Sequence, residues 1–398
     1  MKRTRNVIVG GAFLALLITL GIGQRVMQQT AAAQAKAGVQ APRFEVDPMW
    51  PDPLPNHWVM GNVIGVGVDK NDHVYIIHRG AGSLEPKEIY ATATPPASEC
   101  CVPAPPVVEV DANGKFVRAW GGPGQGFEWP ESNHGITPDT KGNLFIGGNG
   151  GNDGHILKFT TQGKFVKQFG FAYAGAGSND MFAFNKVAKV SLDEAANEAY
   201  VADGYGNHRV AVIDMDTGKI KRYWGAYGNK PDDTSLGNYN PDAPIAQQFR
   251  TPVHCAEPSN DGMVYVCDRP NDRIQVFTKE GKFVKETQVA KTTRGDGSVW
   301  DIAFSKDPQQ KYFYLADGAN EKIHVFDRAS LTELTSFGDG GRQPGQFYAV
   351  HSIATDSKGN VYTTETYRGQ RLQKFVYKGL APVTKPNQGT VWPTRTAQ

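Results

Sequence analysis

Three of the nine histidines stand at the same position of a repeated sequence pattern. His134, His254 and His351 are the first residues of "HGITPDTKGNLFIG", "HCAEPSNDGMVYVCD" and "HSIATDSKGNVYTTE". Three neutral imidazoles that meet at one point bind a metal ion and leave positions open for water or substrate. We therefore predict a three-histidine metal site with zinc as the expected ion. The alternative is that histidines are tolerated in a wet channel.

Two arginines and a tyrosine lie in loops that follow predicted strands. Arg79 is in "VYIIHRG", Tyr205 in "VADGYGN" and Arg269 in "VCDRPND". A guanidinium group can hold a carboxylate with two parallel hydrogen bonds, and nearby positive charges favour the phenolate form of a tyrosine. We expect these three side chains beside the metal, as a carboxylate clamp and a base. The alternative is a structural ion pair, which we expect for Arg273 and Arg371.

Six repeats would bring these residues together. Each repeat is a hydrophobic strand, a tight turn of the D-x-x-G-N type and a second strand, and the other three copies start at Ile64, Ala188 and Trp300. Third and fourth strands usually follow, as in "NHRVAVID" and "GKIKRYWG". The pattern predicts an all-β, six-bladed β-propeller of NHL-like repeats, whose first strands line a central channel. We expect "RFEVDP", from Arg43, to close the ring as the outer strand of the last blade.

The ends of the chain carry different signals. Basic "MKRTR", an apolar run and small residues indicate a signal peptide or an uncleaved anchor in residues 1–33, before a linker at 34–42. The propeller is expected at 43–378 and a Pro/Thr-rich tail at 379–398. This layout predicts a periplasmic or secreted monomer that meets a membrane only through such an anchor. The net charge of +2 gives no electrostatic reason to bind nucleic acid.

The four cysteines suit an oxidising compartment. Cys255 and Cys267 flank a predicted hairpin, where a cross-strand disulfide is plausible. Cys100 and Cys101 are adjacent, and neighbouring Cα atoms lie only about 3.8 Å apart, so a bond between them would be strained. Free thiols, a vicinal disulfide and a metal role stay open, and we favour a structural loop. They lie in a long insertion of the first blade, 82–106, of the kind that is often functional.

Over residues 44–378 the chain resembles the peptidyl-α-hydroxyglycine α-amidating lyases, also called peptidylamidoglycolate lyases. "NHGI", "VHCA" and "VHSI" are similar to that family's zinc motifs. "GVGVDKNDHVYIIHRG", "VADGYGNHR" and "CDRPNDRI" are similar to the segments that carry its catalytic residues. The resemblance implies lysis of a carbinolamide C–N bond to an amide and glyoxylate. Tyr205 would be the base, and Arg79 and Arg269 would hold the carboxylate of a peptide or small-molecule substrate.

The chain departs from that family at two positions. The resemblance implies a calcium ion bound through the backbone carbonyls of Val66 and Ile136, but Ser352 stands where the family has an aspartate ligand. We therefore expect calcium binding to be weak or lost. Gly206 replaces a family cysteine beside the catalytic tyrosine. Two other functions remain: a metal-dependent hydrolase or lyase for another small carboxylated molecule, and a non-catalytic extracytoplasmic binding propeller.

Overall fold

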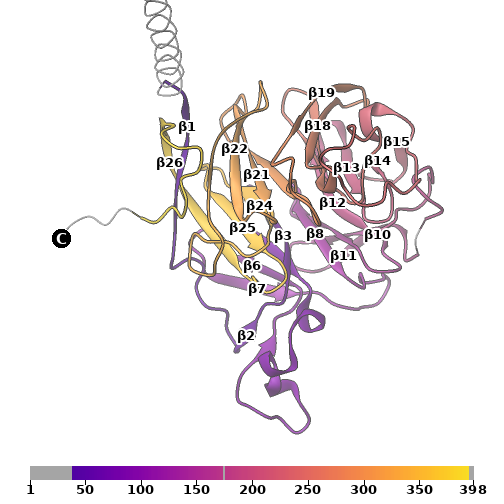
Figure 1. Cartoon of the computed structure of the whole chain (residues 1–398). Helices are drawn as coiled ribbons and strands as arrows, with labels where there is room; N and C mark the ends of the chain where they lie inside the picture. The colour runs from indigo at the N-terminus through magenta and orange to yellow at the C-terminus, as the bar shows by residue number, and fades with distance from the viewer. Residues whose placement is uncertain (1–37, 174, 394–398) are drawn as a thin grey trace, which may run out of the picture.

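The computed structural model describes residues 38–173 and 175–393, which form a six-bladed β-propeller (Figure 1). Each blade is a four-stranded sheet, and the pairing between neighbouring strands is antiparallel throughout the six sheets. The first strand of each blade contacts the first strands of both neighbouring blades, so these six strands form a closed inner ring. The predicted fold is confirmed.

Within each blade, the strands of the sheet follow one another in chain order. The last blade is the exception, because the N-terminal strand is its outer strand. Blades one to three consist of β3 (Val63–Val68), β4 (Val74–His78), β6 (Val107–Val110) and β7 (Phe116–Trp120); β8 (Asn133–Pro138), β9 (Asn143–Gly148), β10 (Gly154–Thr160) and β11 (Phe165–Phe171); and β12 (Val187–Asp193), β13 (Glu198–Asp203), β14 (Arg209–Asp214) and β15 (Ile220–Trp224). Blades four to six consist of β16 (Val253–Pro258), β17 (Met263–Asp268), β18 (Arg273–Thr278) and β19 (Phe283–Gln288); β20 (Asp301–Phe304), β21 (Tyr312–Asp317), β22 (Lys322–Asp327) and β23 (Thr332–Phe337); and β24 (Val350–Thr355), β25 (Val361–Glu365), β26 (Leu372–Pro382) and β1 (Gln40–Val46).

The repeated aspartate shapes the turn between the first two strands of a blade. In blade two, Asp139 Oδ1 accepts hydrogen bonds from the backbone N–H groups of Lys141 (2.9 Å) and Asn143 (2.7 Å). Gly142 has a φ of +84°, in the left-handed region that glycine adopts without a steric penalty. Asp356 makes the equivalent contacts in blade six. The D-x-x-G-N pattern is therefore an aspartate-capped turn that fixes where each inner strand ends.

The hydrophobic core is divided among the six spaces between neighbouring blades. Each space holds a cluster of buried side chains from the two facing sheets. Between blades five and six, Phe44 packs its ring 5.2 Å from those of Tyr314 and Phe337. Burial on both faces explains why the inner strands read as continuous apolar runs.

The ring is closed by the N-terminal strand, as the segment at Arg43 predicted. β1 pairs with β26 as the outer strand of blade six, and Figure 1 shows the indigo strand beside the yellow one. β1 begins at Gln40, within the expected linker, and β26 continues beyond residue 378 to Pro382. Val46 N also donates to Val391 O at 2.7 Å, so part of the expected tail packs against the propeller.

The expected signal peptide or anchor at 1–33 lies outside the described residues. Within the ranges that the structure describes, no helix is both long and apolar enough to span a membrane. The helices of these ranges are short 3-10 turns: η1 (Gly80–Ser83), η2 (Pro86–Glu88), η3 (Tyr90–Thr92), η4 (Glu194–Ala196), η5 (Ala226–Gly228) and η6 (Arg269–Asn271).

Both cysteine pairs form disulfides. Cys255 and Cys267 face each other across β16 and β17, with an S–S distance of 1.98 Å, which confirms the predicted bond. Cys100 and Cys101 form a vicinal disulfide, one of the alternatives that the sequence left open. They lie in the insertion of blade one, directly before β5 (Val102–Pro103), which pairs in parallel with β2 (Trp58–Val59). Figure 1 shows this insertion extending away from the six sheets.

Candidate metal centre

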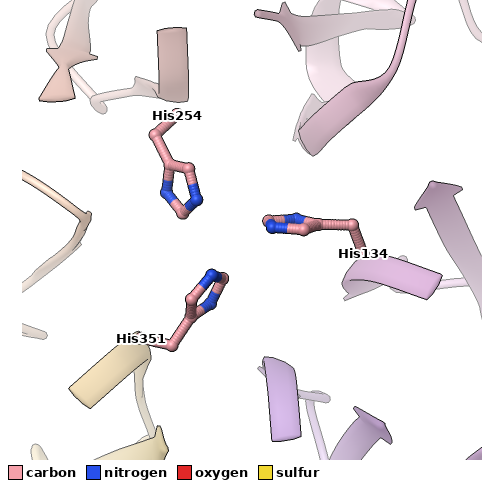
Figure 2. Close-up of side chains that lie close together, drawn as sticks. All are labelled: His134, His254 and His351. Carbon is pink, nitrogen blue, oxygen red and sulfur yellow. The ribbon is translucent and has the colours of Figure 1, made fainter. Parts of the chain in front are cut away.

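The three histidines of the repeat register meet in the central channel. His134 lies on β8, His254 on β16 and His351 on β24, the first strands of blades two, four and six. All three are buried, and Figure 2 shows their rings pointing toward one another from three separate strands. The ring centroids are 4.8 to 5.1 Å apart, and one nitrogen from each residue lies within 4.8 Å of the others. These histidines can therefore hold a metal ion.

Backbone carbonyls from the intervening blades orient two of the rings. His134 Nδ1 donates to Ala188 O at 2.7 Å, and His254 Nδ1 donates to Trp300 O at 2.5 Å. Because a carbonyl only accepts, each Nδ1 must carry the proton, which leaves a lone pair on each Nε2. Ala188 and Trp300 occupy the histidine register in blades three and five. His351 Nδ1 is buried without a hydrogen-bond partner among the described residues.

Burial keeps the three imidazoles neutral. It lowers the pKa of His134 to about 3, and the nearby charges of Arg79 and Arg269 act in the same direction. Burial also holds the pKa values of His254 and His351 well below the ordinary value of 6.5. A neutral imidazole is the form that binds a metal ion, so the channel favours the ligand form at neutral pH.

The Tyr205 hydroxyl contacts two of the histidines. Its Oη lies 3.0 Å from His134 Nε2 and 3.1 Å from His254 Nε2, and Arg269 Nη1 donates to it at 3.3 Å. One hydroxyl can donate only one hydrogen, whereas both Nε2 atoms present lone pairs. One lone pair therefore stays unmatched, and a cation between the rings would satisfy both. This donor set of imidazole nitrogens fits zinc.

The two arginines approach the same point from blades one and four. Arg269 begins η6 directly after β17, and its guanidinium group lies 4.5 Å from the ring centre of Trp300. Arg79 follows β4 and donates from Nη2 to Asn149 Oδ1 at 3.0 Å. Its charge helps to lower the pKa of His134. Arg79 has no acidic partner among the described residues, so it can accept an anion.

Sequence reasoning missed the two residues that flank Arg269 at the rim. Asp296 Oδ1 lies 3.4 Å from Arg269 Nη2, and Tyr367 Oη donates to Asp296 Oδ2 at 2.9 Å. Asp296 lies in the loop before β20, and Tyr367 follows β25. Asp296 occupies no repeated position. Tyr367 stands two residues after β25, just as Tyr205 stands two residues after β13, so the register of these loops could have indicated it. Trp300 does stand in the histidine register. Its carbonyl accepts the hydrogen bond from His254, and its ring packs against the Arg269 guanidinium group.

The surroundings of Val66 and Ile136 agree with the expectation that calcium binding is weak or lost there. Both residues line a channel cavity of about 260 Å³ together with Lys189 and Glu257. The Lys189 ammonium contacts Glu257 and Asp301 there, so a divalent cation would meet a positive charge. Among the described residues, the three histidines are the only group of three or more His, Cys, Asp or Glu placed to hold an ion. These residues do not fit calcium.

Comparison with known proteins places the chain among β-propellers. A family model described as "Lactonase, 7-bladed beta-propeller" matches residues 151–357, more than half of the chain, although the described residues form six blades. Peptidyl-glycine alpha-amidating monooxygenase B of Xenopus laevis is 27% identical over 269 residues, which cover 65% of this chain and 27% of that protein. The chain thus spans about a quarter of that relative's length.

Two further matches cover most of the chain. NHL repeat-containing protein 3 of Mus musculus is 23% identical over 406 residues, covering 94% of this chain and 97% of that protein. A crystal structure of a structural genomics protein of unknown function from Bacteroides thetaiotaomicron superposes with a TM-score of 0.50 at 13% identity. It covers 85% of this chain and 76% of that one. This structural likeness supports the propeller fold.

Proposed function

The chain belongs to the β-propeller family described as lactonase, 7-bladed β-propeller, and on this scaffold we propose that it is a metal-dependent carbon–nitrogen lyase. It would cleave a carbinolamide to an amide and glyoxylate. The observation that carries the proposal is the meeting of three neutral histidines with the Tyr205 hydroxyl and two arginines. Similarity to the amidating monooxygenases over 65% of the chain supports it.

Each side chain has a role in this reaction. A zinc ion held by the three histidines would supply Lewis acidity at the position of the substrate hydroxyl. Acting as a phenolate, Tyr205 Oη would accept the proton of that hydroxyl, and the electrons of the breaking C–N bond would pass to nitrogen. Tyr205 would then give this proton to the departing amide nitrogen and return to the phenolate, so the proton count balances. Arg79 and Arg269 bind the carboxylate that becomes part of glyoxylate.

The setting that we propose for this reaction is extracytoplasmic. Two disulfides suit an oxidising compartment such as the periplasm or the cell exterior. The substrate is a peptide or small molecule with a terminal carboxylate, and the protein acts as a monomer without nucleic acid.

Metal content and lyase activity test the proposal together. We expect about one zinc ion per chain, and release of glyoxylate from a peptide ending in α-hydroxyglycine. A His134→Ala/His254→Ala/His351→Ala variant should lose both. The matched control is His57→Asn, at an exposed histidine outside the channel. A well-folded, metal-free wild-type protein with no activity would overturn the proposal and favour a binding propeller.

The family description favours one second candidate, a metal-dependent hydrolase that opens a lactone. The same three histidines would hold the metal, and the arginines would bind the carboxylate that ring opening produces. Lactones and an α-hydroxyglycine peptide should be assayed with the same zinc-loaded preparation. Turnover of a lactone with an inert hydroxyglycine peptide would select the hydrolase over the lyase.

A further inference from the structure

The central channel holds a second group of charged residues, two of which lie one position beyond the histidine register. Lys189 follows Ala188 on β12, and its Nζ lies 2.7 Å from Asp301 Oδ1 and 2.7 Å from Glu257 Oε1. Asp301 follows Trp300 at the start of β20, and Glu257 lies on β16. We refer to Lys189, Glu257 and Asp301 as the channel triad. The Lys189 side chain is only 12% exposed and that of Asp301 only 2%.

Hydroxyl and backbone groups complete the surroundings of the channel triad. Ser352 Oγ on β24 donates to Asp301 Oδ2 at 2.7 Å, and Ile353 N donates to the same oxygen at 3.1 Å. Ser191 Oγ on β12 donates to Glu257 Oε1 at 2.7 Å. Each of blades three to six therefore contributes at least one polar side chain to the cluster around the Lys189 ammonium and the two carboxylates that contact it. Oxygen ligands from several strands around one cation are the arrangement of a divalent-ion site.

The ammonium of Lys189 stays charged in this position. Burial alone would lower the pKa of Lys189, but Asp301 and Glu257 raise it above the ordinary value of 10.5. Removing this charge would leave two carboxylates facing each other in a buried channel, where like charges repel strongly. A cation between the two acidic groups therefore stabilises the closed ring of blades.

We propose that the Lys189 ammonium is the built-in cation of the channel and takes the place of a divalent ion. The structure of the propeller would then be independent of calcium. Shortening Lys189 would expose Glu257 and Asp301 as ligands and create a calcium site. This inference concerns the stability of the ring and does not depend on any catalytic activity.

The first test is a calcium titration of the zinc-loaded wild-type protein. Isothermal titration calorimetry should detect no calcium binding, and 5 mM CaCl2 should leave the Tm unchanged. Lys189→Ala should melt earlier than wild type without calcium, and CaCl2 should raise its Tm by about 3 °C or more because the ion binds only the folded state. If this variant folds only when calcium is present, that result supports the inference equally.

Matched variants separate a new calcium site from a general effect. Lys189→Arg keeps a cation beside both carboxylates, so calcium should not change its Tm. Lys189→Ala/Glu257→Gln/Asp301→Asn lacks the acidic ligands, so calcium should not change its Tm either. Stoichiometric calcium binding by wild type would overturn the inference, as would a folded Lys189→Ala variant that does not respond to calcium. If Lys189→Ala does not fold in either buffer, the wild-type titration decides the question.

Discussion

Tyr205 is the residue whose substitution most directly tests the chemistry. A general base contributes about 10²- to 10⁴-fold to a rate, so Tyr205→Phe should lower kcat by that factor. The phenylalanine keeps the ring packing of the loop and removes only the hydroxyl between His134 and His254. Zinc content, measured on the same sample, should stay at the wild-type level. Full activity in this variant would exclude Tyr205 as the base.

Asp296 should compete with the substrate for Arg269. Its carboxylate is about half exposed and lies 3.4 Å from the guanidinium group, a weak contact. Exposed ion pairs contribute about 0.2 to 1 kcal/mol, so Asp296→Asn should lower KM by up to about 5-fold while kcat stays unchanged. Tyr367→Phe is the matched control, because it removes only the hydrogen bond to Asp296. A raised KM in Asp296→Asn would instead mean that Asp296 holds Arg269 in position.

At the scale of single residues, the sequence was informative only where residues repeat. His134, His254 and His351 could be predicted to converge because they share one register in alternate blades. Arg79, Tyr205 and Arg269 could be placed because each follows the second strand of its blade. Lys189 and Asp301 also lie one position beyond the register, yet their contact depends on side-chain direction across the channel. That direction follows from packing and has no pattern in the sequence.

At the scale of the element, one histidine joins three strands of blade five. His324 on β22 contacts Asp317 on β21 at 3.1 Å and Glu333 on β23 at 2.7 Å. Burial alone would lower the pKa of His324, but the hydrogen bonds to both carboxylates raise it to about 9. The folded blade thus binds this proton more tightly than the unfolded chain, where histidine titrates near 6.5.

This proton makes the stability of blade five depend on pH. Because the pKa is raised on folding, the stabilisation is complete below pH 6.5 and is lost as the pH rises through about 9. The shift corresponds to about 3 kcal/mol. Relative to His324→Gln, the wild-type protein should show this advantage in urea unfolding at pH 6 and lose it by pH 9.5. Parallel stability curves for the two proteins over that range would contradict the expectation.

Strand boundaries were predictable where a turn motif marks them. The aspartate of the D-x-x-G-N pattern caps the turn, so the ends of β8 and β24 could be read from sequence. The extension of β26 to Pro382 was missed because its outer pairing partner is β1, more than 300 residues earlier in the chain. The sequence predicted the pairing of the segment from Arg43 with the last blade, but residues 40–42 and "APVT" carry no local strand pattern that shows how far the pairing extends.

At the scale of the whole molecule, the closing strand should control stability. Phe44 is only 1% exposed and packs between blades five and six. Phe44→Ala should lower the free energy of unfolding by about 3 to 5 kcal/mol. Arg43→Ala, at an exposed position of the same strand, should change it by about 0.5 kcal/mol or less. Equal denaturation midpoints for the two variants would mean that β1 is not needed for closure.

All six blades contribute to the centre: Arg79 from the first, His134 from the second, Tyr205 from the third, His254 and Arg269 from the fourth, Trp300 from the fifth and His351 from the sixth. A ribosome releases these parts in order, and the His351 imidazole emerges only after blades one to five have been made. A chain whose synthesis stops before His351 therefore cannot assemble the three-histidine site by itself. Capture of a metal ion would therefore serve as a late checkpoint, marking molecules whose ring has been completed.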